Sequence, residues 1–307
     1  MKVFVTGAAG LIGFSVAHAL ARVGHEVHGL VRRPEKAARL PAAEIAPVLG
    51  ASEDPGGYAA VAERCQVLVH CAAELSERFM DIDGRSVDAL LSIAQRSSEP
   101  RLVVYTSGTW VYGDLPSGAV VDEGTSPLPL PFITERVALE RMLLNASQGR
   151  LRTIVIRPGL VYGGSGGLTA SWFQSAEAEG AATLVGEGEN RLGMIHVHDL
   201  ADLYLRAIES PWGGEVFNAT DRSRFTMREC AEAASRAAGA GGRIKQVPVN
   251  EAQRTLGPVA QGLALNQHVD SSKAARLLGW QPRHGGFVDA VDRFHAAWKA
   301  HRTPQTA

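Results

Sequence analysis

The sequence predicts a doubly wound α/β fold, in which helices cover both faces of a parallel β-sheet. Short, almost continuous apolar runs alternate with amphipathic segments of helical length in the first half of the chain, and such runs are typical of strands buried on both faces. The chain of 307 residues is 45% hydrophobic and 21% charged, which is ordinary for a globular protein. This length suits one large domain with a smaller second one.

The predicted elements follow in a regular order. Strands are expected at residues 3–6, 26–31, 65–71, 102–106 and 151–157, and helices at 11–23 and around 87–95. After Gly163 longer helical patterns dominate. Thr226 and Glu229 form the pattern of a capping box at the start of one helix, and a further helix opens at Ser271 and ends at Gly279. We therefore expect the sheet domain at residues 1–165 and a smaller lobe in residues 166–307, with some segments returning to the first domain.

Charge and cysteine content narrow the class of protein. The formal net charge is −1 with both signs interspersed, so neither a nucleic-acid-binding face nor a polybasic membrane-binding run is expected. The three cysteines form no CxxC pair and no disulfide framework, which is typical of a reducing cytosol. Glycines interrupt the apolar N-terminal segment, which argues against a signal peptide, and no run reaches the ~18 apolar residues of a membrane span. We expect a cytoplasmic protein that acts on a small-molecule substrate.

A glycine-rich turn lies between the first strand and the first helix, with the spacing Gly7-x-x-Gly10-x-x-Gly13. The first glycine permits a tight turn, the second lets the backbone approach a pyrophosphate, and the third lets the helix pack close to the strand. The free N–H groups and the dipole of the helix then favour phosphate. This context predicts a dinucleotide-binding Rossmann domain.

The end of the second strand indicates which dinucleotide is bound. A cofactor with a free 2′-hydroxyl usually meets an acidic residue at this point, but here Val31 is followed by Arg32 and Arg33. A guanidinium suits a 2′-phosphate. We therefore expect NADP(H) to be preferred, with NAD(H) as the other option. The alternative interpretation is that both arginines are solvated loop cations.

Motifs along almost the whole chain resemble the extended short-chain dehydrogenase/reductases, also called the NAD-dependent epimerase/dehydratase family. The similar segments are VTGAAGLIG (5–13), VLVHCAA (67–73), VYTSGTWVYG (104–113), IRPGLVYG (156–163), MIHVHDLADLY (194–204) and SSKAARLLGWQP (271–282). The resemblance implies a dinucleotide-dependent enzyme and a homodimer. The family's usual acidic residue for the adenine amine is replaced by Ala51.

The expected cofactor-binding residues combine the turn, the strand end and the resemblance. The resemblance places residues 70–73 beside the adenosine, residues 106–107 beside the nicotinamide ribose and residues 158–161 against the nicotinamide. The complete set is Gly7, Ala9, Gly10, Leu11, Ile12, Gly13, Arg32, Arg33, His70, Cys71, Ala72, Ala73, Thr106, Ser107, Arg136, Pro158, Gly159, Leu160 and Val161.

The catalytic positions depart from the family's pattern. The resemblance implies hydride transfer assisted by a tyrosine and by a lysine four residues later, on one helix face. Phe132 stands at the tyrosine position, Arg136 at the lysine position and Gly108 at the position of the usual serine. Phenylalanine cannot donate a proton, whereas a permanently charged arginine can still bind ribose hydroxyls and stabilise a developing alkoxide.

The missing tyrosine leaves several candidates for the proton donor. We expect the catalytic residues among Ser107, Arg136, Tyr112 and Tyr162, with Thr109 and ordered water as further candidates. Both tyrosines follow strand ends that face the predicted cleft, although each is also a packed aromatic in the family's pattern. No spacing in the sequence singles out one donor.

Two other clusters have structural interpretations. His196 and His198 would share one face of a strand while Asp199 points away or caps the next helix, so we expect no metal site. Cys71 is expected to act as a small hydrophobic residue rather than a nucleophile.

Three functions fit these residues. The first is an NAD(P)H-dependent reductase of a small-molecule carbonyl, in a tailoring step of specialised metabolism and with a non-standard proton donor. The second is a nucleotide-sugar epimerase or dehydratase, against which the loss of the tyrosine counts. The third is a non-catalytic NAD(P)-binding module.

Overall fold

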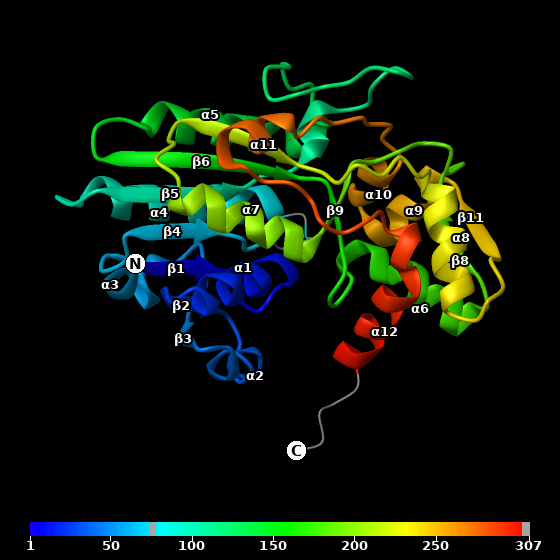
Figure 1. Ribbon diagram of the computed structural model, residues 1–307, viewed down its shortest axis with the longest axis horizontal. Coiled ribbons are helices and arrows are strands. Elements are labelled where there is room, and N and C mark those ends of the chain that lie inside the picture. The colour runs from blue at the N-terminus through cyan, green and yellow to red at the C-terminus, as the bar shows by residue number, and fades with distance from the viewer. Residues whose placement is uncertain (74–75, 77, 303–307) are drawn as a thin grey trace.

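A seven-stranded parallel sheet forms the centre of the larger domain (Figure 1). The computed structural model describes residues 1–73, 76 and 78–302. The strand order is β10-β6-β5-β4-β1-β2-β3. The strands are β1 (Lys2–Thr6), β2 (Glu26–Val31), β3 (Ile45–Leu49), β4 (Val67–His70), β5 (Arg101–Thr106), β6 (Leu151–Pro158) and β10 (Glu215–Ala219). The doubly wound α/β fold is thus confirmed.

Alternation of side chains along the strands builds one hydrophobic core on each face of this sheet. Val3 and Val5 pack with α1 (Leu11–Arg22), α7 (Val197–Glu209) and α11 (Ser272–Leu278). Phe4 points to the other face and packs with α3 (Ala59–Ala62), α4 (Phe79–Gln95) and α5 (Thr134–Ala146). Because both faces are covered, the strands read as continuous apolar runs.

The smaller lobe is built around two-stranded sheets and helices (Figure 1). Strands β8 (Ala182–Val185) and β11 (Ile244–Val247) pair in parallel, and so do β7 (Leu160–Tyr162) and β9 (Met194–His196). The helices of this lobe are α6 (Ala170–Glu179), α8 (Met227–Ala237), α9 (Val249–Leu256), α10 (Val259–Leu263) and α12 (Val291–Arg302). Its core is aromatic and includes Trp172, Phe173, Phe287, Phe294 and Trp298. Strand β10 and helices α7 and α11 pack with the large sheet rather than with this lobe.

Most local predictions agree with the structure, and the differences have physical causes. The capping box at Thr226 and Glu229 is present, and Gly279 ends α11 in the left-handed conformation (φ 61°). No strand was predicted at β3, because its run Ile45–Leu49 contains Pro47, and proline within a run argues against a strand except at the edge of a sheet, where β3 lies. It also placed the start of α4 too late, because Asp81 and Asp83 break up the apolar pattern of the first turns. The short helix α2 (Pro34–Ala37) follows β2.

Candidate functional site

A cavity of about 610 Å³ runs along the carboxyl ends of strands β1 to β6. Ligands bind at this edge of open parallel sheets, because the loops that follow the strands there leave a crevice. The volume lies in the range of small-molecule sites, roughly 300–1,000 Å³. By the strand order, the glycine-rich turn and the loops after β2 and β3 line one half of the cavity, and residues that follow β5 and β6, among them Ser107 and Leu160, line the other, together with Arg136 of α5.

The glycine-rich turn has the geometry that a dinucleotide phosphate needs. Gly7 has a φ of +66°, and a Cβ there would lie 2.7 Å from the backbone of Ala72. A Cβ on Gly13 would lie 2.3 Å from the carbonyl oxygen of Gly7. Gly10 is the N-cap of α1 and offers no side-chain cap, so the N–H groups of the first turn remain available at the cavity wall formed by Leu11 and Ile12. The residues present fit a bound dinucleotide.

Three basic side chains line the other side of this phosphate-binding end. Arg32 and Arg33 follow β2, and Lys36 lies in α2. All three are exposed to solvent at the mouth of the cavity. After β3, Ser52 and Glu53 also line the cavity near the position where Ala51 replaces the expected acid. Lys36 and Glu53 were missed in the sequence because neither belongs to a recognisable motif.

His70 does not line the cavity, contrary to the sequence-based expectation for this residue. It is 2% exposed and lies behind the turn. Its Nδ1 is hydrogen-bonded to the Thr6 hydroxyl at 2.8 Å, and the backbone N–H groups of Cys71 and Ala72 donate to the same hydroxyl oxygen at 3.2 Å. On its other side, His70 Nε2 lies 3.0 Å from Oδ1 of Asp83. His70 therefore links the end of β1 to α4 rather than contacting adenosine.

Asp83 is the centre of a buried network beneath the cavity. Besides His70, the Tyr105 hydroxyl donates to its Oδ2 at 2.5 Å, and Arg136 Nη2 donates to the same oxygen at 3.4 Å. Burial raises the pKa of Asp83, but the hydrogen bond from His70 and the charge of Arg136 outweigh it, so the net pKa is lowered. The carboxylate is therefore charged and holds Arg136 in place.

Arg136 places a fixed positive charge in the cavity wall. Its Nη1 lies 3.4 Å from the carbonyl oxygen of Ser107, and its guanidinium lies over the ring of Phe79, 4.6 Å from the centroid. Burial lowers the pKa of Arg136, but Tyr105 and Asp83 together raise it above the ordinary value. Its Nε is buried, and no group of the described residues is a hydrogen-bond partner for it. The Arg136 side chain is 14% exposed, so the guanidinium keeps donor capacity at a largely buried position.

Ser107 supplies a hydroxyl group at the same place. It follows β5, is 5% exposed, and its Oγ has no hydrogen-bond partner among the described residues. A buried hydroxyl without a partner is costly unless a ligand completes it. The neighbouring Gly108 lies close to two other groups. A Cβ at this position would be 3.7 Å from Nη1 of Arg136 and 3.8 Å from the carbonyl oxygen of Pro158.

Phe132 and the two candidate tyrosines lie elsewhere. The ring of Phe132 is half-buried and packs edge-on against Trp110, with 6.4 Å between centroids. The Tyr112 hydroxyl lies 2.9 Å from both the carbonyl oxygen of Asp122 and Oδ1 of Asn218, between which it shares its one proton, and Arg157 donates to its oxygen. The Tyr162 hydroxyl, in the core of the smaller lobe, lies 2.9 Å from Oδ2 of Asp221 and 2.7 Å from the carbonyl oxygen of Gly285 and shares its one proton between them.

These two tyrosines are corrections to the sequence analysis. Neither lines the cavity in the described part of the chain, and burial raises the pKa of both hydroxyl groups. They are structural members of polar networks, because the strand ends turn their rings away from the cleft. We do not propose either of them as the proton donor.

Most of the remaining predicted residues meet at the cavity. Of the expected cofactor-binding set, those that line it are Gly7, Ala9, Gly10, Leu11, Ile12, Arg32, Arg33, Cys71, Ala72, Ala73, Thr106, Ser107, Arg136, Pro158, Gly159, Leu160 and Val161. Gly13 does not line the cavity; it lies in α1, where the lack of a side chain lets the helix approach the carbonyl oxygen of Gly7. Cys71 is half-buried, and burial raises the pKa of its thiol to about 12, so it is no thiolate.

Part of the cavity wall is apolar, and sequence reasoning missed it. Its members that belong to no recognised motif or pattern are Phe79, Ile82, Ile133 and Leu168, and Trp110 adds an indole ring to them. They come from α4, from the segments before α5 and α6, and from the short turn after β5. Only the tertiary fold brings them together.

Comparisons with known proteins agree with this geometry. Residues 3–220 match the NAD dependent epimerase/dehydratase family. The chain is 29% identical over 294 residues to an uncharacterised protein of Schizosaccharomyces pombe, covering 92% of this chain and 96% of that one. It is 27% identical over 320 residues to a 4-hydroxy-2-methyl-3-oxo-4-farnesyl-3,4-dihydroquinoline-1-oxide ketoreductase of Stigmatella aurantiaca, covering 95% and 96%.

A solved structure has the same fold over nearly the full chain. The dTDP-glucose 4,6-dehydratase of Bacillus anthracis, solved in complex with NAD, superposes with a TM-score of 0.83 at 20% identity and covers 98% of this chain and 97% of that one. Among the described residues, no helix has both the length and the apolar character that crossing a membrane requires.

Proposed function

Because the chain belongs to the NAD dependent epimerase/dehydratase family, we propose that it is an NADP(H)-dependent reductase of a small-molecule carbonyl. The family relationship indicates an NAD-dependent oxidoreductase-type enzyme. The observation that carries the finer proposal is the pairing of a buried hydroxyl that lacks a partner, Ser107, with the fixed cation of Arg136 in one cavity.

These two side chains suit a carbonyl oxygen that becomes negative during reduction. A reduced nicotinamide dinucleotide, when bound, supplies the hydride. Ser107 Oγ–H is free to donate a hydrogen bond to the carbonyl oxygen, and the charge of Arg136 stabilises the developing alkoxide. Since arginine stays protonated, Arg136 acts through its charge and not as an acid. The proton that completes the alcohol passes through Ser107, which regains one from water entering the cavity.

The cavity wall favours an apolar carbonyl substrate over a nucleotide sugar. Besides Ser107 and Arg136, the lining of the cavity includes the apolar side chains of Phe79, Trp110, Ile133 and Leu168. The basic residues that line the described cavity are Arg32, Arg33 and Lys36 at the phosphate-binding end, and Arg136 at the other. A nucleotide sugar would bring a second diphosphate, which usually binds to basic side chains of its own. The similarity to a ketoreductase also favours a carbonyl substrate over a nucleotide sugar.

Removal of the Ser107 hydroxyl tests the proposal. We expect Ser107→Ala to lower kcat for ketone reduction by ~10²-fold, the usual loss for one donor to a developing oxyanion, with little change in NADPH affinity. NADPH consumption with a panel of aromatic and 1,3-dicarbonyl ketones measures the rate. Ser92→Ala, at an exposed serine of α4, is the matched control. Binding of NADPH without reduction of any ketone, together with turnover of a nucleotide sugar, would instead favour an epimerase.

The basic residues after β2 carry the proposed preference for NADP(H). Arg32→Ala should raise the Kd for NADPH by ~10-fold or more, because a charge-assisted hydrogen bond contributes roughly 1.5–3 kcal/mol. The Kd for NADH, which has no 2′-phosphate, should stay the same and serves as the internal control. Fluorescence titration measures both. Equal weakening of the two dinucleotides would contradict a specific phosphate contact.

A further inference from the structure

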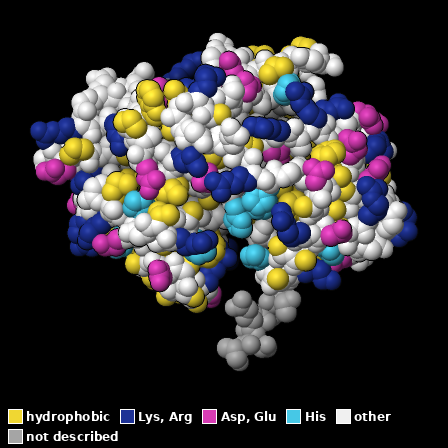
Figure 2. Space-filling model, viewed as in Figure 1, with side chains coloured by type: hydrophobic (Ala, Val, Ile, Leu, Met, Phe, Trp, Pro, Cys, Tyr) yellow, Lys and Arg dark blue, Asp and Glu magenta, His cyan; other side chains and the backbone are white. Residues whose placement is uncertain are grey.

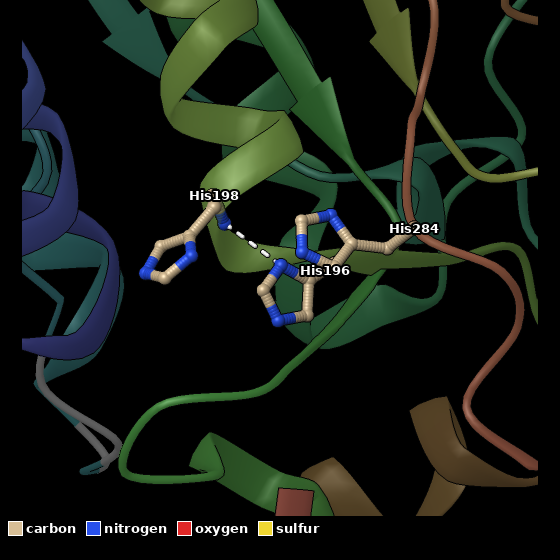
Figure 3. A group of neighbouring side chains, drawn as sticks. All are labelled: His196, His198 and His284. Carbon is tan, nitrogen blue, oxygen red and sulfur yellow. Dashed lines mark hydrogen bonds between the residues drawn. The ribbon is translucent and has the colours of Figure 1, made fainter. Parts of the chain in front are cut away.

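Three histidines gather outside the cofactor cavity, where α7 begins (Figure 2). His196 ends β9, His198 lies in the first turn of α7, and His284 lies in the segment after α11. One ring nitrogen of each falls within 4.8 Å of the others. The sequence analysis expected no metal here because it saw only His196 and His198 and placed both on one strand. The structure puts His198 on the helix and adds His284 from far along the chain (Figure 3).

One nitrogen of the His284 ring, Nδ1, is hydrogen-bonded to a carboxylate, as in many metal sites. His284 Nδ1 donates to Oδ1 of Asp199 at 2.9 Å, and Oδ2 of the same carboxylate accepts from the backbone N–H groups of Arg283 and His284. A carboxylate that binds one imidazole nitrogen fixes the ring and leaves the lone pair of the other nitrogen available, which is the usual arrangement behind a metal-bound histidine. Asp199 is buried, so this support is rigid.

The other two imidazoles are neutral and close by. The backbone N–H of His198 donates to Nδ1 of His196 at 3.2 Å. Burial, followed by the neighbouring His284, lowers the pKa of His196 to about 3, and the same two causes lower the pKa of His198. Neutral rings bind a metal without first losing a proton. His198 is exposed and reaches solvent, which gives an ion a path of entry.

We propose that His196, His198 and His284 form a binding site for a divalent transition-metal ion of the zinc type. Imidazole nitrogens suit Zn²⁺, Ni²⁺ and Cu²⁺, and three protein ligands with water in the fourth position make a common zinc site. The ion would join the segment that carries His284 to the start of α7, and so connect the smaller lobe with a helix that packs on the large sheet.

Metal binding has a defined geometric requirement. His196 and His284 are stacked, with 3.6 Å between centroids and 16° between planes, so their lone pairs lie side by side. Nitrogens on one tetrahedral zinc are about 3.4 Å apart, as follows from Zn–N bonds of about 2.0–2.1 Å. For both His196 and His284 to bind one ion, their rings must tilt apart, and the exposed His198 must turn inward. The ion would also replace the backbone N–H of His198 as the partner of His196 Nδ1. This adjustment makes a site of moderate affinity.

Calorimetric titration of untagged, chelator-treated protein with Zn²⁺ tests this site. We expect one saturable site, and His198→Gln and His284→Gln should each weaken it by at least ~10-fold, as loss of a ligand or its support does. His198 is exposed, so its substitution leaves the fold intact. His268→Gln, at a histidine beside Arg224 and outside the cluster, is the control and should bind like the wild type.

Cobalt gives an independent readout of the same site. Co²⁺ bound by imidazoles in a four-coordinate geometry absorbs visible light, and this absorption should disappear in His198→Gln and persist in His268→Gln. Absence of saturable Zn²⁺ binding, or binding by His198→Gln equal to that of the wild type, would overturn the proposal and leave the cluster as a packed aromatic contact.

Discussion

Arg136→Met is expected to lower kcat for ketone reduction by ~10³-fold or more, because it removes the largely buried positive charge that the proposed mechanism uses to stabilise the reacting oxygen. Methionine fills much of the same volume, so the packing against Phe79 is largely kept. Steady-state NADPH consumption measures the rate, and titration with NADPH separates loss of binding from loss of chemistry. A variant with an unchanged kcat would remove Arg136 from the mechanism.

The same substitution should reduce stability, since Asp83 loses its cation. The carboxylate stays bonded to His70 and Tyr105, so we expect a loss of about 3 kcal/mol, the lower end for breaking a buried ion pair. Urea unfolding measures it. Asp83→Asn combined with Arg136→Met removes the uncompensated charge and should recover much of the stability while kcat stays low. Recovery of kcat in the double variant would contradict the role given to the charge.

The dependence of stability on pH follows from the same pair. The pKa of Asp83 is lowered in the folded protein, so the unfolded chain binds this proton more readily. The stabilisation is therefore complete above the unfolded pKa of about 3.9 and is lost as pH falls through the lower, folded pKa. Arg136 contributes to that lowering, so Arg136→Met should lose less stability than the wild type between neutral pH and this acid range.

Sequence reasoning could find features of the site that depend on local spacing. Gly7 and Gly10 lie in the turn and Gly13 in the first turn of α1, and each glycine has its own steric reason. These positions could be predicted because short-range geometry fixes them. Phe132 and Arg136 are four residues apart in sequence, but Phe132 lies in the 3₁₀ turn before α5 and packs against Trp110, so only Arg136 of this pair lines the cavity.

Features that depend on the tertiary fold could not be predicted in the same way. Asp83 looks like an ordinary polar residue of a helix, and only the packing of α4 beside β4 and β5 places it between His70 and Arg136. His284 joins His196 across a long stretch of chain. Tyr112 and Tyr162 were expected at the cleft but do not line the cavity, because a position after a strand does not determine which way a ring points.

Gly13→Ala should weaken NADPH binding by ~100-fold or more, because the phosphate-binding turn cannot keep its shape with a side chain at this position. The added Cβ would lie 2.3 Å from the carbonyl oxygen of Gly7 and 2.7 Å from its carbonyl carbon. These are backbone atoms, which cannot rotate away as a flexible side chain can, so α1 must move off the turn. The first-turn N–H groups then leave the position that the phosphates need. Fluorescence titration with NADPH measures the change.

Gly84→Ala is the matched control for this prediction. Gly84 also lies within a helix, α4, but a Cβ there would meet only Leu139, at 3.9 Å, which is ordinary contact. The same chemical change should therefore leave NADPH affinity unchanged and raise helix stability by about 0.5–1 kcal/mol. Thermal unfolding separates the two effects, since Gly13→Ala should also lower Tm. If Gly13→Ala and Gly84→Ala bind NADPH equally well, close contact between α1 and the turn is not what forms the phosphate site.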